Sequence, residues 1–184
     1  MEGAMLIAMA TVLSYFPKLY ELPQGGSITL EMIPLVVMGL RHGPKWGAGT
    51  GLVHGLLQMI IGFKNVMYCN TIAAMIGCIL LDYLLAFSVL GLALIFARLF
   101  KNRIIGATVG AVICSALRFV CSFLSGWILW GSWAPEGMHP AYYSLTYNGS
   151  YMIPNTIILG AVIAVFATTV PGILFGTQFK HAAE

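Results

Sequence analysis

Two charged side chains lie near the middle of the long apolar stretches 71–98 and 104–131 of this 184-residue chain. Asp82 lies in CILLDYLLAF, and Arg118 lies in CSALRFVCSF. An ionisable group at membrane depth costs on the order of 3 kcal/mol on insertion scales, so it is expected to be paired or to face a polar cavity. Two alternatives follow. Asp82 and Arg118 form an ion pair that joins two helices, or Asp82 faces a ligand, and both hold if Arg118 lies near the cavity.

A second group of residues that could bind a ligand lies in the segment 126–154, GWILWGSWAPEGMHPAYYSLTYNGSYMIP. An interfacial aromatic belt would account for Trp127, Trp133 and Tyr142. It accounts less well for the polar side chains nearby, which are those of Ser144, Tyr147, Asn148 and Ser150. Rings stack on flat ligands and attract cations, and a buried carboxylate binds donors. These residues, together with Asp82, predict a site for a flat, partly cationic heteroaromatic ligand.

Asn148 also begins a glycosylation sequon, Asn-Gly-Ser. Because we expect the last helix to begin at residue 149, we interpret Asn148 as a helix cap.

Other reactive residue types show no catalytic or metal-binding pattern. The four histidines are dispersed, the serines have no triad arrangement, and no nucleotide-binding GK[ST] sequence occurs. Cys69, Cys78, Cys114 and Cys121 form no CxxC pair, and we interpret them as packing residues rather than as disulfide or metal ligands. We therefore expect no enzyme, no metal and no cofactor. The formal charge of +3 is scattered, which argues against a nucleic-acid partner.

The elements that must hold these residues are membrane helices. Hydrophobic residues make up 59% of the chain and charged residues 8%, against about 25% charged in soluble domains. Apolar runs cover residues 3–17, 29–40, 46–63, 71–98, 104–131 and 149–176. The second run is shorter than the roughly 20 residues that a straight crossing needs. We expect a single all-α membrane domain over residues 1–184 with six helices.

The basic residues predict its orientation. With the N-terminus inside, six of them fall at inner ends, namely Arg41, Lys45, Arg98, Lys101, Arg103 and Lys180. The outer loops then hold Lys18 and Lys64. Because cytoplasmic ends are enriched in Lys and Arg, both termini are expected in the cytoplasm, with segments 16–32 and 131–148 outside.

Small residues recur at helical spacing in two places. Gly47, Gly51 and Gly55 share one helix face, where they allow another backbone to approach closely. Ala4 and Ala8 repeat the same spacing in the first helix. Both patterns predict helix packing.

Three stretches carry a resemblance to a known family: ELPQGGSITLEMIPL, LLDYLLAF and WGSWAPEGMHPAYYSLTYNGSYMIP. They resemble the substrate-binding S component of energy-coupling factor vitamin transporters, in particular the thiamine-specific one, over residues 4–154. The resemblance implies a six-helix S component of the bacterial plasma membrane that captures thiamine outside the cell. It also implies two kinds of partner, a transmembrane coupling subunit and a pair of ATP-hydrolysing subunits.

The resemblance implies specific site residues as well. The thiamine pocket would use Asp82, Tyr83, Trp130, Tyr143 and Asn148. Trp133 is expected beside Trp130, and Ser122 stands where relatives have a histidine. Residues 23–27 would form a lid whose glycine pair supplies flexibility. Ala4 and Ala8 match the AxxxA element that faces the coupling subunit.

Two further alternatives remain open at this stage. The ligand could be a pyrimidine precursor of thiamine or another small heteroaromatic vitamin. In a different class, the chain could be a structural membrane subunit whose rings form only an interfacial belt.

Overall fold

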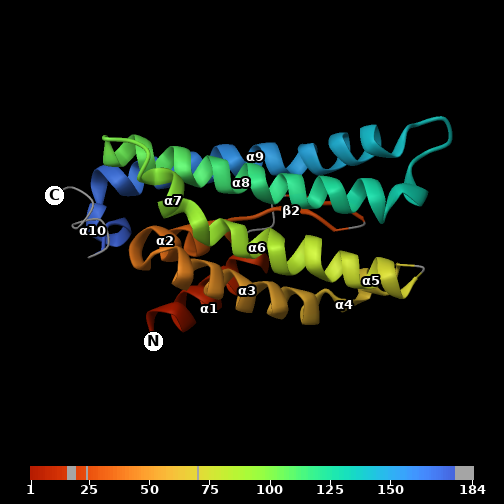
Figure 1. Ribbon diagram of the computed structural model, residues 1–184, viewed down its shortest axis with the longest axis horizontal. Helices are drawn as coiled ribbons and strands as arrows, with labels where there is room; N and C mark the ends of the chain where they lie inside the picture. The colour runs from red at the N-terminus through yellow and green to blue at the C-terminus, as the bar shows by residue number, and fades with distance from the viewer. Residues whose placement is uncertain (16–19, 24, 70, 177–184) are drawn as a thin grey trace.

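The computed structural model describes residues 1–15, 20–23, 25–69 and 71–176, whose long helices lie side by side in a bundle (Figure 1). Lys18, Gln24 and Lys180 lie outside the described residues. Three long helices come first in the chain: α1 (Glu2–Tyr15), α2 (Met32–His42) and α3 (Pro44–Ile61). A short hairpin, β1 (Tyr20–Glu21) and β2 (Ser27–Ile28), lies between α1 and α2, and α4 (Phe63–Val66) follows α3.

The fourth long helix runs from residue 72 to residue 97 and changes its winding along the way. It consists of α5 (Ile72–Cys78), the π-helical η1 (Ile79–Leu85), α6 (Ala86–Ser88), the 3-10 turn η2 (Val89–Leu92) and α7 (Ala93–Ala97). The rest of the chain forms α8 (Arg103–Ile128), the 3-10 turn η3 (Gly131–Trp133), α9 (Pro140–Thr169) and α10 (Pro171–Leu174). Among the described residues, the helix 72–97, α8 and α9 are long and apolar enough to cross a membrane.

The last long helix begins earlier than the sequence predicted. It begins at Pro140 rather than at residue 149, because proline is well suited to a first helical turn and His139 caps the helix by accepting from the Ala141 N–H. Hydrophobicity does not detect these first turns, since they are polar. The interpretation of Asn148 as a helix cap is therefore wrong: this residue lies inside α9 and is buried.

The basic residues gather at one end of the bundle. The first turn of α1, the α2–α3 connection, the α7–α8 connection and α10 lie together there (Figure 1). Arg41 donates to the Gly172 carbonyl and pairs with Glu2, which joins three of these elements. The opposite end, with α4, α5 and the α8–α9 loop, carries Lys64 as its basic residue in the described chain. This bias agrees with the prediction that the end with the first turn of α1 faces the cytoplasm.

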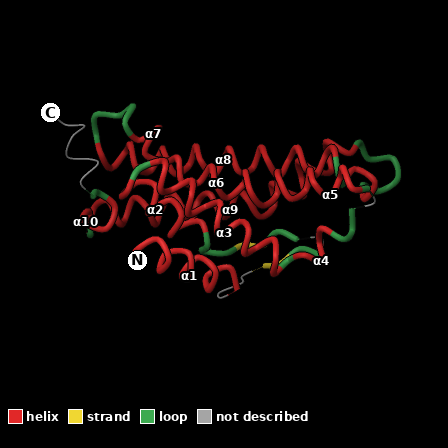
Figure 2. The backbone as a smooth tube through the Cα atoms, turned by 60° about the horizontal axis from the view of Figure 1, so that its bottom comes forward, coloured by secondary structure: helices red, strands yellow, loops and turns green. Residues whose placement is uncertain are grey.

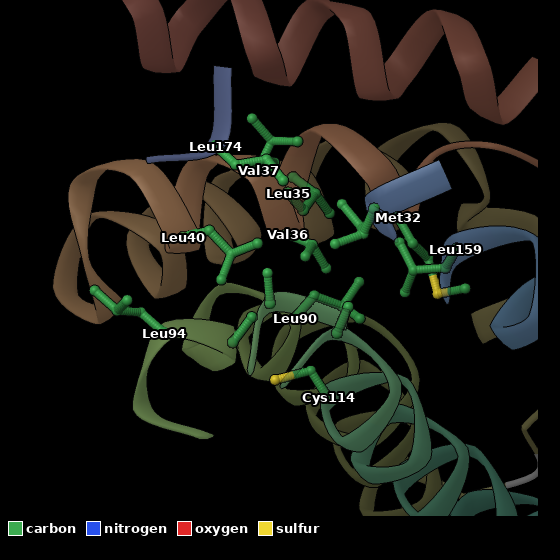
Figure 3. Packing of buried hydrophobic residues seen from close by; sticks show 14 of the residues in the cluster. Met32, Leu35, Val36, Val37, Leu40, Leu90, Leu94, Cys114, Leu159 and Leu174 are labelled. Atoms are coloured by element: carbon green, nitrogen blue, oxygen red, sulfur yellow. The ribbon is translucent and has the colours of Figure 1, made fainter. Parts of the chain in front are cut away.

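The second apolar run is a core helix. In α2 every residue from Pro34 to Leu40 is buried, which is expected for a helix that is hydrophobic on all sides. Figure 3 shows Leu35, Val36 and Leu40 in one cluster with Leu90 of the fourth helix and Leu159 of α9. The second apolar run therefore forms a short, buried helix of the core, not a helix that crosses the membrane with one face to lipid.

The glycine face of α3 packs against the fourth helix, which confirms the packing interpretation. A Cβ atom at Gly51 would overlap the Phe87 carbonyl, and one at Gly55 would meet the carbonyl of Tyr83 at 2.5 Å. Gly47 and Gly91 approach each other in the same way. This close contact sets the position of the helix that carries Asp82.

We expect Gly51→Ala to lower the free energy of unfolding by about 1–3 kcal/mol, because a methyl group there must push two backbones apart. Gly49→Ala is the matched control. Gly49 is exposed on the same helix, and nothing lies within 4 Å of a Cβ at that position. Thermal unfolding of both variants in detergent measures the difference. Equal midpoints for the two variants would show that the helices are not held this closely.

Candidate functional site

A cavity of about 430 Å³ lies among the helices and the hairpin. All seven residues predicted for the ligand site line it: Asp82, Tyr83, Ser122, Trp130, Trp133, Tyr143 and Asn148. They come from the fourth helix, α8, the turn that follows α8 and the first half of α9. Pockets for small molecules typically enclose about 300–1,000 Å³, so this cavity is large enough for one vitamin-sized ligand.

Asp82 is positioned by the π-helical part of the fourth helix. Its Oδ2 atom accepts hydrogen bonds from the Ser125 hydroxyl at 2.5 Å and the Cys78 thiol at 3.3 Å, and the Trp130 side chain also bonds to this carboxylate. π-helical turns are rare and frequently occur at functional sites, because the wider turn redirects the side chains. The carboxylate is thus fixed in the cavity wall by three donors.

Of the two alternatives for Asp82, the ion pair with Arg118 is wrong. Arg118 Nη2 lies 2.8 Å from Glu31 Oε1, in the connection between β2 and α2. The guanidinium also lies over the Phe87 ring, 4.2 Å from its centroid. Asp82 is not within ion-pair distance of a cation in the described part of the chain. Its carboxylate can therefore meet a donor or a cation supplied by a ligand.

A polar network beside the cavity was missed in the sequence. It comprises Glu31, His54, Gln58 and Ser14: the other Glu31 oxygen lies 3.8 Å from His54 Nε2, and Gln58 donates to the Ser14 hydroxyl at 2.7 Å. Glu31, Gln58 and Ser14 line the cavity, and His54 lies fully buried behind them. Glu31 and His54 fall inside the apolar runs 29–40 and 46–63, so the signal that singled out Asp82 would also have found them.

The first half of α9 forms an aromatic and amide wall. Tyr143, Tyr147 and Tyr151 recur at intervals of four and line the cavity, and the first two rings have centroids 5.6 Å apart. Asn148 accepts from the Tyr151 hydroxyl at 2.8 Å and donates to the Ser144 carbonyl at 3.0 Å. Because both ends of its amide are bonded, its orientation toward the cavity is defined.

Aromatic rings also line the end of the cavity at the α8–α9 turn. Trp130 and Trp133 follow α8, and Trp133 makes an edge contact with Tyr68, with centroids 6.0 Å apart. Tyr83 donates to the Gly62 carbonyl at 3.3 Å, which joins the fourth helix to the end of α3. Trp127 and Tyr142 are exposed and do not line the cavity, as expected for members of an interfacial belt.

The β1–β2 hairpin lies beside the long helices (Figures 1 and 2). Its residues line one side of the cavity, and β2 contacts α9. Gly25 and Gly26 have φ angles of +96° and +89°, which favour glycine. The Tyr147 hydroxyl donates to the Gly25 carbonyl at 2.9 Å. Asn155 donates to the Ser27 carbonyl at 2.8 Å and accepts from the Thr29 N–H at 3.0 Å. Of the predicted lid, 23–27, only Gln24 is outside the described residues.

The helix bundle encloses a vitamin-sized cavity whose walls carry aromatic rings, amides and the carboxylate of Asp82, which pairs with no cation of the described residues. This arrangement is that of a membrane protein that binds or transports a small molecule. The family model described as Thiamine transporter protein (Thia_YuaJ) matches residues 1–174, and the chain belongs to this family. The family is one of transporters rather than enzymes.

Individual relatives extend this assignment over nearly the whole chain. Thiamine transporter ThiT of Bacillus subtilis (strain 168) is 35% identical over 183 residues, covering 94% of this chain and 92% of the relative. Thiamine transporter ThiT of Lacticaseibacillus paracasei is 26% identical over 190 residues, covering 98% of this chain and 92% of the relative. A solved structure of ThiT from Listeria monocytogenes is 27% identical, covers 95% of both chains and superposes with a TM-score of 0.74, which confirms the expected fold.

We expect Tyr147→Phe to loosen the hairpin, because it removes the hydroxyl that donates to Gly25. A hydrogen bond contributes about 0.5–1.5 kcal/mol, so the backbone amides of residues 20–22 and 25–28 should exchange with solvent about 2- to 10-fold faster. Hydrogen-exchange mass spectrometry of the ligand-free protein measures this without relying on ligand contacts. Tyr142→Phe, at an exposed ring of the same helix, is the control. Unchanged exchange in Tyr147→Phe would show that this bond does not hold the hairpin.

Proposed function

We propose that this protein is the thiamine-binding S component of an energy-coupling factor importer and captures thiamine outside the cell for ATP-driven uptake. The observation that carries the proposal is the convergence of Asp82, Trp130, Tyr143 and Asn148 on one cavity. These residues come from distant parts of the sequence. Membership of the thiamine transporter family supports the same ligand.

The chemistry of the cavity suits the two rings of thiamine. The aminopyrimidine carries donors and acceptors, for which a carboxylate and a fixed amide are suitable partners. The thiazolium is flat and cationic, so it is attracted to the faces of Trp130 and the neighbouring tyrosines. Asp82 is suited to receive a donor or offset positive charge because it lies within ion-pair distance of no described cation.

Ser122 leaves space on one wall of the proposed site. Its side chain is buried, and its carbonyl accepts from the Asn148 amide at 3.3 Å. A serine hydroxyl can donate and accept, but unlike a histidine it cannot stack on a ring. One lost stacking contact corresponds to about 0.5–1.5 kcal/mol, which is too little to abolish recognition while the other anchors remain.

The outer face of α1 is suited to contact the coupling subunit. Ala4 and Ala8 are exposed, and the apolar residues beside them, Met5, Met9 and Val12, are exposed as well. Small residues on a membrane helix let a second helix approach closely. We place the transmembrane coupling subunit on this stripe, and two ATP-hydrolysing subunits would act through it.

We expect thiamine to quench or shift the tryptophan fluorescence of the purified protein saturably, because Trp130 and Trp133 line the cavity.

Asp82→Asn should weaken thiamine binding by about 10- to 200-fold, which corresponds to losing a charge-assisted hydrogen bond of about 1.5–3 kcal/mol. Glu136→Gln makes the same acid-to-amide change at an exposed residue outside this cavity and should leave the affinity unchanged.

Parallel titrations with the isolated aminopyrimidine and thiazole halves separate the alternative ligands. Tighter binding of the pyrimidine half than of thiamine would assign the site to a precursor. Absence of saturable binding by a folded protein would favour the structural-subunit alternative.

We expect Ala8→Trp to abolish uptake and assembly with the coupling subunit while thiamine affinity stays within about 2-fold, because Ala8 is exposed away from the cavity. Ile157→Trp, at an exposed residue of α9, is the control and should transport normally. The two measurements are co-purification of the subunits and thiamine uptake in cells. Normal assembly of Ala8→Trp would show that the coupling subunit docks elsewhere.

A further inference from the structure

Cys69 and Cys78 lie together beside the candidate ligand site. Both are buried members of one small cluster with Val66. They share this cluster although the residues are nine positions apart and Cys69 precedes the helix that holds Cys78. All four cysteines are free thiols, and the other two, Cys114 and Cys121, lie on α8.

Cys78 connects this pair to the chemistry of the cavity. It lines the cavity, and its thiol donates to Asp82 Oδ2 at 3.3 Å. It is one of the three donors that hold the carboxylate in place, together with Ser125 and Trp130. A change in the chemical state of Cys78 therefore acts directly on the residue proposed to bind the ligand.

The location of the pair favours oxidation. Cys69 lies in the short connection between α4 and α5, at the end of the bundle opposite the basic residues (Figure 1). The charge bias puts this end outside the cytoplasm, where disulfides form and persist. The interpretation of these two residues as packing residues describes their reduced state only.

We propose that Cys69 and Cys78 form a redox modification site, in which a disulfide between them withdraws the thiol donor from Asp82 and weakens ligand binding. The co-reactant is a small organic disulfide. Cys69, as its thiolate, attacks one sulfur of the reagent and releases one thiol. Cys78, giving up its proton, then attacks the mixed disulfide and releases the second thiol. Two protein thiols are oxidised and one external disulfide is reduced to two thiols.

Loss of the S–H group changes the contact with Asp82 from a hydrogen bond to an approach of two electron-rich atoms. A disulfide sulfur has no proton to donate, so the carboxylate keeps the donors from Ser125 and Trp130 and must move away from Cys78. We expect the affinity for thiamine to fall about 3- to 10-fold, the order of one weak hydrogen bond. This magnitude rests on the proposed thiamine function, whereas formation of the disulfide does not.

The reaction should be slow at neutral pH. Burial, together with the negative charge of the nearby Asp82, raises the pKa of the Cys69 thiol, and only the thiolate attacks. Cys69 is also 9% exposed, so a small reagent is required. Oxidation should therefore accelerate as the pH is raised toward about 8.5.

The test uses the full chain with Cys114→Ala and Cys121→Ala, so that Cys69 and Cys78 are its only cysteines. The protein is treated with 2-hydroxyethyl disulfide at about pH 8.5 and then freed of reagent. Peptide mass spectrometry detects a bond between residues 69 and 78, and a fluorescence titration measures thiamine affinity before and after reduction with dithiothreitol. Cys69→Ala in the same background is the matched control, because it cannot form the bond and keeps the Cys78–Asp82 contact.

The expected result is an intramolecular 69–78 bond with reversibly weakened thiamine binding, and no effect of the reagent on Cys69→Ala. Absence of the bond after prolonged treatment would overturn the proposal. Unchanged affinity in the bonded protein, or an equal loss in Cys69→Ala, would overturn it as well. Absence of thiamine binding in the reduced protein would instead refute the proposed function, while the mass measurement would still decide whether the pair reacts.

Discussion

The ion pair between Arg118 and Glu31 is the interaction on which the candidate site depends. A lone guanidinium inside a membrane bundle would be paired with the nearest carboxylate, and Asp82 is close enough to feel its charge. Glu31 takes this role at 2.8 Å, and the Phe87 ring covers the guanidinium from another side. Because Arg118 pairs with Glu31, Asp82 is left to the neutral donors Ser125, Cys78 and Trp130. A carboxylate with neutral donors can still attract a cationic ligand, whereas one bound to arginine cannot do so strongly.

The same pair links the cover of the cavity to its wall. Glu31 directly precedes α2 and follows the hairpin, so its bond to α8 holds the end of the hairpin segment in place. Asn155 of α9 holds the strand Ser27–Ile28 next to it, and Tyr147 holds Gly25 at the tip. The hairpin is thus fixed most firmly where it joins the core helix α2. At the tip, the Leu22 N–H donates to the Gly26 carbonyl at 2.9 Å and the Gly25 N–H donates to the Leu22 carbonyl at 3.2 Å.

The sequence predicted the number of long helices and the helix-packing role of the glycine face, and its resemblance to a known family implied most of the seven residues that line the cavity. Hydrophobic runs and the i, i+4 glycines depend on local spacing, which is visible in one dimension. The partner of Arg118 is not local: Glu31 is 87 positions away, and a single sequence does not say which of two carboxylates lies closer in space. The early start of α9 was missed for a different reason. Its first turns face a polar cavity, so the hydrophobic run begins at residue 149, after the helix has begun at Pro140.

The winding of the fourth helix was not predicted from the sequence. The segment CILLDYLLAF is apolar apart from Asp82 and Tyr83, which indicates a membrane helix but not the winding of its turns. The glycine face of α3 contacts this helix along its length, with Gly55 against the Tyr83 carbonyl, Gly51 against the Phe87 carbonyl and Gly47 against Gly91. The 3-10 turn η2 contains Gly91 at the tightest contact, and the wider η1 turn lies where Asp82 reaches the cavity. Both windings therefore occur along one contact with the glycine face of α3, and Asp82 extends into the cavity from the wider part. The helix that makes this contact lies elsewhere in the sequence, so the packing cannot be predicted from the segment CILLDYLLAF alone.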